Sequence, residues 1–322
     1  MKAAWIALLV LPLLTVTTTA KVLPEPAIND VEDSRNEFLD APGFMHRWRA
    51  MLALDRRHLY RLAETDTTDQ RLRIFAADLA ANEAQMVRAR QAGNLISSDG
   101  HERVVSETLR TISASGDGSR ETPFASLSEV EAMRYMALTG RTTVATALVV
   151  TRLGDPLLAV WSKDDAAGQP WYFSLKSVYR RMRRAFAYTS PNRNVTGYHF
   201  LVHMAEKGSP AALVGRAATI LAADEPERSG EITEWLHTAA RASNALAIVL
   251  LGDMERKQAP DSEPSRHREQ LAKALAHYAQ ASDLGYGPAA QRAQEVKAEL
   301  AALTTPAMEV AVSATMSLGL QK

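Results

Sequence analysis

Two histidines and a glutamate lie at helical spacing in the sequence GYHFLVHMAE, residues 197–206. His199 and His203 are four residues apart and Glu206 follows three residues later, so a helix would place all three on one face. Two imidazoles and a carboxylate are a ligand set that zinc accepts, as in a metal-dependent hydrolase. The HExxH order of zinc proteases is absent, and no second ligand cluster is visible. The sequence therefore favours ordinary surface or inter-helix histidines, and a metal-dependent hydrolase of the cell envelope is the alternative.

The most concentrated charge lies in the segment KSVYRRMRRAF, residues 176–186. On a helix its apolar side chains would form one stripe, made of Leu175, Val178, Tyr179, Met182 and Phe186. The other side would carry four basic residues, Lys176, Arg180, Arg183 and Arg184. Such a face can bind an acidic partner, an anionic glycan or lipid headgroups. It can equally be a solvated face whose charges pair with acids elsewhere, which is the more common case.

Motifs for covalent catalysis are missing from the sequence. There is no GxSxG, no SxxK, no Walker loop and no GxGxxG between a strand and a helix. The chain contains no cysteine, which excludes disulfides, thiolate metal sites and a cysteine nucleophile. We therefore expect a protein that is not an enzyme and uses no cofactor.

The first twenty residues, MKAAWIALLVLPLLTVTTTA, have the features of a cleavable signal peptide. Lys2 precedes an apolar run, and Thr18-Thr19-Ala20 supplies small residues for cleavage. The run is shorter than the roughly 20 residues of a membrane span, so we expect no span after cleavage and keep an uncleaved anchor as the alternative. Lys+Arg and Asp+Glu each count 37 in the 322 residues, which gives no overall field for nucleic acid. The prediction is a periplasmic or secreted protein.

The apolar pattern of the rest is mainly helical and predicts an all-α fold. Helices are expected from a cap at Thr68 to Gly93-Asn94, at about 101–113, and at about 127–139 with Ser126 or Ser128 as its cap. Residues 142–190 are ambiguous, because short β-branched apolar runs form helices or strands. The segments LLAVW (157–161) and WYFSL (171–175) could pair as a hairpin. In an otherwise helical chain we favour a helix with a long loop.

Three stretches in the last third of the chain resemble one another. Each has an alanine-rich or apolar helix end, a short turn and a second helix that opens with alanine, and the turns align at Gly208, Ser243 and Gly285. The spacings of 35 (243 − 208) and 42 (285 − 243) residues are typical of helical-hairpin repeats. Small residues recur three positions before and four positions after the turn: Ala205, Ala240 and Ser282, then Ala212, Ala247 and Ala289. Glycine suits a left-handed residue at a helix end, and alanines let paired helices approach closely.

This pattern, together with Leu251-Gly252, resembles SLR (Sel-one-like) repeats, a subclass of tetratricopeptide-like helical repeats, over about residues 191–304. A divergent further unit could lie at MALTGRTTVATALV, where Ala137 and Gly140 fit and Val144 replaces alanine. The resemblance implies an α-solenoid whose concave surface docks protein partners, and it brings no catalytic residues. The alternative is an alanine-rich helical bundle whose glycine turns recur by chance.

The expected organisation is a signal peptide (1–20), a linker (21–42), an N-terminal helical region (43–153), a middle segment with the basic helix (154–190), SLR-like repeats (191–304) and a tail (305–322). The expected function is an exported, non-catalytic scaffold or adaptor that binds a partner protein in the cell envelope through its solenoid surface. The alternatives are the metal-dependent hydrolase that uses His199, His203 and Glu206, and a binder of anionic glycan or lipid through the basic face at 176–184.

Overall fold

The computed structural model describes residues 31–40, 44–45, 48, 79–165, 168–189, 196–223, 226–258 and 263–303. The predicted signal peptide at 1–20, the predicted cap at Thr68 and the tail at 305–322 lie outside the described residues. The described part is mostly helical, as predicted, but it also contains a four-stranded sheet, so the all-α prediction is wrong in that respect.

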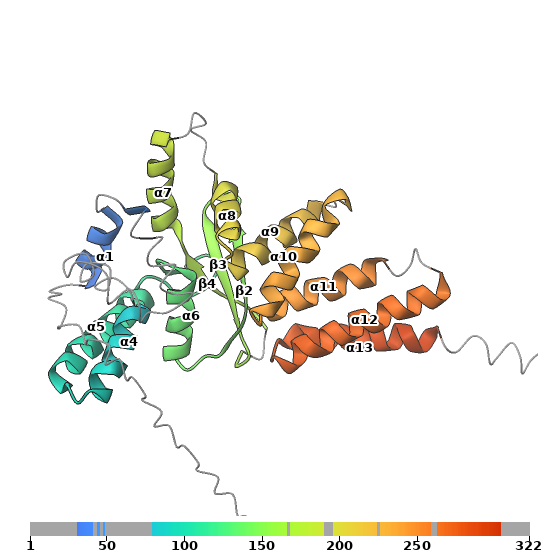
Figure 1. The fold of residues 1–322 in the computed structure, drawn as a ribbon, viewed down its shortest axis with the longest axis horizontal. Coiled ribbons are helices and arrows are strands. Elements are labelled where there is room, and N and C mark those ends of the chain that lie inside the picture. Colours follow the sequence, from blue (N-terminus) through green and yellow to red (C-terminus); the bar gives the residue numbers. More distant parts are fainter. Residues whose placement is uncertain are drawn as a thin grey trace, which may run out of the picture.

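The helices and strands follow one another in the order shown in Figure 1. The α-helices are α1 (Val31–Asp40), α4 (Leu79–Gln91), α5 (Leu95–Ala114), α6 (Glu129–Leu138), α7 (Lys176–Thr189), α8 (Gly197–Glu206), α9 (Pro210–Ala223), α10 (Ser229–Arg241), α11 (Ala245–Gln258), α12 (Pro264–Asp283) and α13 (Gly287–Ala302), with a 3₁₀ turn η1 (Pro226–Arg228) before α10. The strands are β1 (Phe124–Ala125), β2 (Thr143–Val150), β3 (Pro156–Ser162) and β4 (Trp171–Ser174).

The sheet overturns the helix expected within residues 142–190. Its strand order is β1-β4-β3-β2, with β2 and β4 both antiparallel to β3 and the short β1 parallel to β4. The weighed alternative, a hairpin between LLAVW and WYFSL, is the observed β3–β4 pair, in which Leu157 lies opposite Ser174. The β-branched residues of β2 favour a pleated, buried position over a helix. The divergent repeat unit proposed around Gly140 is also wrong, because a strand rather than a helix follows that turn.

The segment expected to be a linker at 21–42 contains the helix α1. Its Val31, Arg35 and Phe38 are buried, at 3%, 7% and 3% exposure. Spacings of four and three residues place them on one face of the helix. Phe38 packs edge-on against Phe44, with ring centroids 5.8 Å apart. The linker prediction is therefore wrong for residues 31–40, which belong to the packed fold.

One type of turn ends five of the described helices. In each, a residue with positive φ follows the helix, and the next amide donates back to a carbonyl five residues earlier, which is the Schellman arrangement. The five positive-φ residues are Gly93, Gly140, Gly208, Ser243 and Gly285. In the first predicted repeat, for example, Ser209 N donates to Met204 O at 3.1 Å. The left-handed turns predicted at Gly208 and Gly285 are confirmed, and Ser243 adopts the same conformation at φ 60°.

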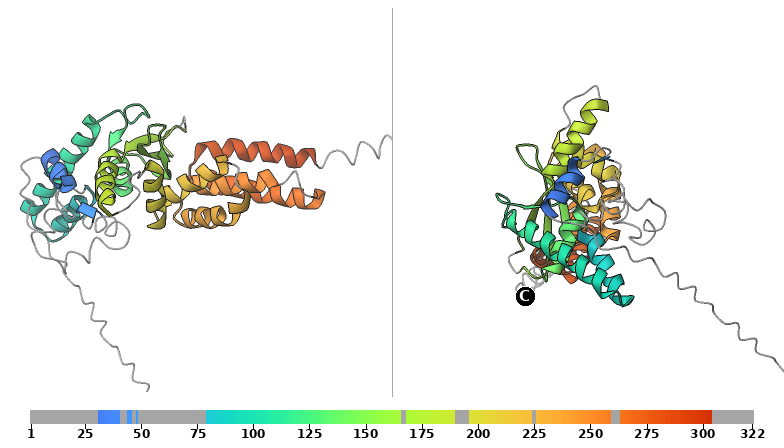
Figure 2. Two further views of the ribbon diagram at one scale, coloured as in Figure 1. Left: turned by 90° about the horizontal axis from the view of Figure 1, so that it is seen from above. Right: turned by 90° about the vertical axis from the view of Figure 1, so that its left-hand side faces the viewer.

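The last six helices form three hairpins, α8–α9, α10–α11 and α12–α13, whose turns lie against α6 and the sheet. Asn244, just after the second turn, donates its side-chain amide to Thr146 O of β2 at 2.8 Å. Gly285 of the third turn lies against Val144, near the start of β2, and against Lys163, just after β3. In Figures 1 and 2, α9 to α13 extend from the sheet in one direction, while α1, α4 and α5 lie on its opposite side.

Small residues set the spacing of these hairpins, as the sequence predicts. The framework alanines Ala205, Ala212, Ala247 and Ala289 are buried, and Ala240 is partly buried. At Gly252 a Cβ would meet the Tyr278 ring at 2.8 Å, so this glycine allows α11 and α12 to pack closely. Within the described ranges, none of the helices is both long and apolar enough to cross a membrane.

Candidate functional site

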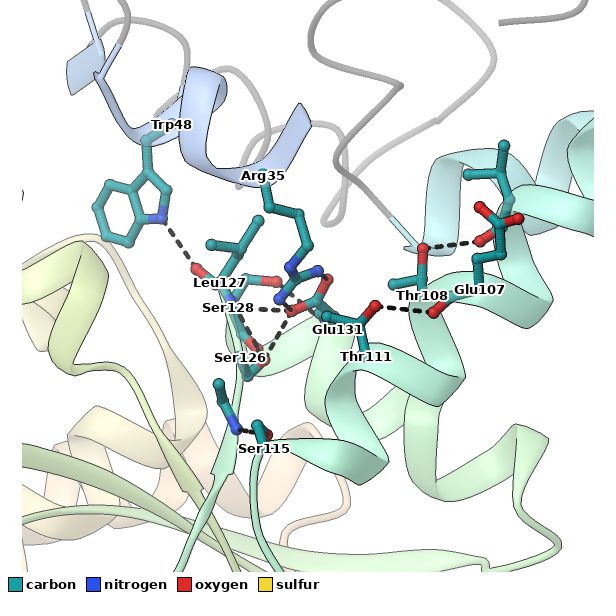
Figure 3. Close-up of polar contacts among 12 residues, drawn as sticks. Arg35, Trp48, Glu107, Thr108, Thr111, Ser115, Ser126, Leu127, Ser128 and Glu131 are labelled. Atoms are coloured by element: carbon teal, nitrogen blue, oxygen red, sulfur yellow. Dashed lines mark hydrogen bonds and ion pairs between the residues drawn. The ribbon is translucent and has the colours of Figure 1, made fainter. Parts of the chain in front are cut away.

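The first turn of α6 carries two buried carboxylates, and Glu131 is one of them. Ser128 caps the helix by accepting from Glu131 N at 3.0 Å, which fixes the start of α6. The Glu131 carboxylate accepts two bonds from Arg35 of α1, at 2.5 and 3.0 Å, and one from Leu127 N at 2.7 Å. Ser126 adds a fourth donor at 3.1 Å, as Figure 3 shows. This charge-assisted network fastens α1 to α6 across 96 residues of sequence.

An open pocket of about 610 Å³ lies beside this network, between α1, α5 and β1. Several of its polar side chains already serve the fold: Thr111 donates to Glu107 O at 2.9 Å, and Ser115 donates to Ile112 O at 2.6 Å while accepting from Ala125 N at 2.7 Å (Figure 3). Trp48 donates to Leu127 O, the carbonyl of a lining residue, at 3.1 Å. These groups position helices and a strand. Ser126 of the lining donates to Glu131, but that carboxylate is already paired with Arg35, which makes it a poor base.

The second carboxylate, Glu129, joins α6 to the repeats. It accepts from Ser209 Oγ at 2.5 Å, from Ala211 N at 3.3 Å and from Thr146 Oγ1 at 3.2 Å. Ser209 in turn caps α9 by accepting from Ala212 N at 3.2 Å. A carboxylate at the start of α9 also complements the positive end of that helix. Glu129 therefore links the sheet region to the first hairpin through hydrogen bonds.

The basic face predicted at 176–184 lies on α7. Its apolar stripe is buried, since Val178, Tyr179 and Met182 are between 0% and 6% exposed. Lys176 is engaged in an ion pair with Asp155 at 2.5 Å. Three predicted contact residues of this face, Arg180, Arg183 and Arg184, are exposed, and the described residues offer them no ion pair. The side chain of Phe186 lies outside the described part.

The histidines of α8 do not form the metal site considered from the sequence. His199 caps the helix, because its Nδ1 lies 3.2 Å from Thr196 N and 2.9 Å from Thr196 Oγ1. Among the described residues, His199, His203 and Glu206 included, no three ligands of the metal-binding types are grouped so that they could hold an ion. The predicted helical spacing is real, but it brings together a capping group and two further residues rather than a metal site.

The two buried hydrogen-bond networks around Glu129 and Glu131 were not predicted from the sequence. The first-turn positions of Glu129 and Glu131 followed from the helix start, but their partners lie 17 to 96 residues away. The spacing of Ser128 and Glu131, as in a capping box, was the available signal for Glu131. Arg35 gave no signal, because its partner is distant in sequence.

Comparison of the chain with protein-family models, with curated proteins and with solved structures finds no match. The function is therefore inferred from the three hairpins and the charged face of α7.

Proposed function

We propose that the protein is an exported, non-catalytic scaffold that holds a partner protein along the hairpins α8 to α13. The observation that carries this proposal is the regular series of three hairpins, in each of which the two helices are joined by the same left-handed turn, at Gly208, Ser243 or Gly285. Stacked helical hairpins of this kind offer an extended surface rather than one pocket. We propose that the series belongs to the SLR class and that the protein works in the periplasm or outside the cell.

The hairpins are fastened to one another well enough to present such a surface as a unit. Asp253 of α11 accepts from the Tyr278 hydroxyl at 2.7 Å and pairs with Arg292 of α13. Arg256 of α11 pairs with Glu295 at 2.9 Å and also with Glu299. Burial, with the bond to Asp253, raises the pKa of Tyr278 and keeps its hydroxyl a donor. The last hairpin is thereby held to the one before it.

A binding role also agrees with the hydrogen bonds that the polar groups of the described region make. The carboxylates of Glu129 and Glu131 and the imidazole of His199 are all bonded to helix starts or to neighbouring elements. Groups that hold the fold in this way are poor candidates for proton transfer or metal binding. This favours a scaffold over the metal-dependent hydrolase.

Site-specific photocrosslinking in the native host tests the proposal. A photoreactive residue would replace, one at a time, the exposed Glu234 of α10, Lys273 of α12 and Lys297 of α13, with exposed Arg110 of α5 as the matched control. We expect one protein to be captured from positions on at least two successive hairpins and not from Arg110. Capture at a single position only, or equally at Arg110, would contradict an extended binding surface.

A further inference from the structure

An exposed leucine lies in the turn between β2 and β3. Leu153 is 90% exposed, and Arg152 beside it is also exposed. The turn is well bonded: Thr151 N donates to Asp155 O and Gly154 N donates to Thr151 O, both at 2.9 Å. A single exposed leucine is ordinary on a protein surface, so its neighbours decide what it means.

The starts of α7 and α8 both meet this turn. Lys176 at the start of α7 pairs with Asp155 at 2.5 Å, and Leu175 N donates to Pro156 O at 3.2 Å. At the start of α8, a Cβ on Gly197 would lie 2.1 Å from Gly154 O, so the two backbones touch. The residue after Gly197 is Tyr198, which is 38% exposed. Leu153 and Tyr198 therefore lie at the same end of the sheet, and both are exposed.

The helix α7 adds exposed positive charge beyond this turn. Arg180 lies one helix turn beyond Lys176, and Arg183 and Arg184 lie two turns beyond it, within about 12 Å along α7. The three arginines are exposed and have no ion-pair partner in the described part of the chain. Since the whole chain has a formal net charge of +0, this positive charge is a local feature.

We propose that this end of the molecule docks on the surface of an anionic phospholipid bilayer. Leu153 inserts at the boundary between headgroups and acyl chains, Tyr198 lies at the interface, and Arg152, Arg180, Arg183 and Arg184 contact lipid phosphates. An anionic polysaccharide could pair with the arginines, but it would offer no apolar region into which Leu153 could insert. The exposed leucine therefore favours a bilayer as the ligand. Such docking would hold the scaffold at a membrane surface, which is a role beyond the binding of a partner protein.

Vesicle binding of the purified protein tests the docking. The vesicles contain phosphatidylglycerol and phosphatidylcholine, with pure phosphatidylcholine vesicles and soluble dextran sulfate as comparison probes. Each basic residue near an anionic surface is worth about fivefold in binding, so R180S/R183S/R184S should weaken the partition coefficient about a hundredfold. The matched control, R110S/R120S/R266S, makes the same charge change at other exposed arginines and should weaken it far less. Leu153→Ser should weaken vesicle binding about tenfold and leave dextran sulfate binding unchanged.

The absence of native cysteine allows a second readout in which no arginine is altered. A fluorophore that senses polarity, attached to L153C, should shift to the blue on anionic vesicles. The same label on L95C, which replaces a 66% exposed leucine of the distant α5, should not shift. Equal loss in the two arginine variants, binding to dextran sulfate but not to vesicles, or an unshifted label at position 153 would each overturn the proposal.

Discussion

At Gly215 the backbone of α9 lies directly against β2, and Gly215→Ala tests this contact between the first hairpin and the sheet. A Cβ at this position would lie 1.8 Å from Leu148 O of β2. A carbon normally approaches a carbonyl oxygen to about 3.3 Å, so α9 and β2 would have to separate by about 1.5 Å. The obstacle is backbone, which cannot rotate away as a flexible side chain does.

The expected cost follows from two opposed effects. Overpacking in a well-packed interior costs about 1–3 kcal/mol, and a clash with backbone belongs at the upper end. Replacing glycine by alanine inside a helix returns about 1 kcal/mol. We therefore expect a net destabilisation of about 2 kcal/mol. Gly230→Ala in α10 is the matched control: nothing lies within 4 Å of its Cβ position, so it should stabilise by up to about 1 kcal/mol.

Urea unfolding of the two variants measures the free energy of unfolding, and hydrogen exchange locates the change. The amides of α9 and β2 should lose protection in Gly215→Ala and keep it in Gly230→Ala. If Gly215→Ala were as stable as the unaltered protein, or shifted in the same direction as Gly230→Ala, the close α9–β2 contact would be refuted.

Three further outcomes are expected. Ser243→Gly should stabilise the protein by about 1 kcal/mol in urea unfolding, because serine is strained at φ 60°; a loss of stability would contradict this. Glu131→Gln removes the carboxylate with which buried Arg35 pairs and should cost about 3 kcal/mol, whereas Glu83→Gln, which breaks a more exposed pair, should cost less than about 1 kcal/mol; equal costs would count against the network. The hydroxyl of Thr122 and the amide of Ser119 lower the pKa of Asp117 from 3.8 to about 2; because the folded-state pKa is the lower one, its stabilising effect is present above pH 3.8 and lost as the pH falls towards about 2. A carbon NMR titration of this carboxyl with a midpoint near 3.8 would show that the bonds are absent.

Local sequence signals predicted the helical hairpins. The turns at Gly208 and Gly285 follow from glycine's freedom at positive φ, and Ser243 was located only through alignment with them. The apolar stripe of α7 followed from its periodicity, and the structure buries Val178, Tyr179 and Met182. The residues that produce each of these features lie close together in the sequence, so a single sequence is sufficient to predict them.

The sheet and α1 were missed for different reasons. The β-branched run of β2 was predicted to be helical because the surrounding chain is helical, although β-branched residues themselves favour a strand. Val31, Arg35 and Phe38 do have helical spacing, but prolines and acids around them suggested a linker. The Arg35–Glu131 pair lies beyond any local signal, because tertiary packing alone brings residues 96 positions apart into contact.

The position of the repeats has a consequence for how the sheet meets other chains. β2 is an edge strand, and an open edge is a template for pairing with a strand of another molecule. The helix α9 lies against Leu148 O, and Asn244 donates to Thr146 O, so these two carbonyls of the edge are covered. The opposite edge is a strand of two residues whose Ala125 N is bonded to Ser115. By covering this edge, the hairpins hinder strand pairing between molecules. A variant in which α9 separates from β2 should therefore be prone to form intermolecular β-structure.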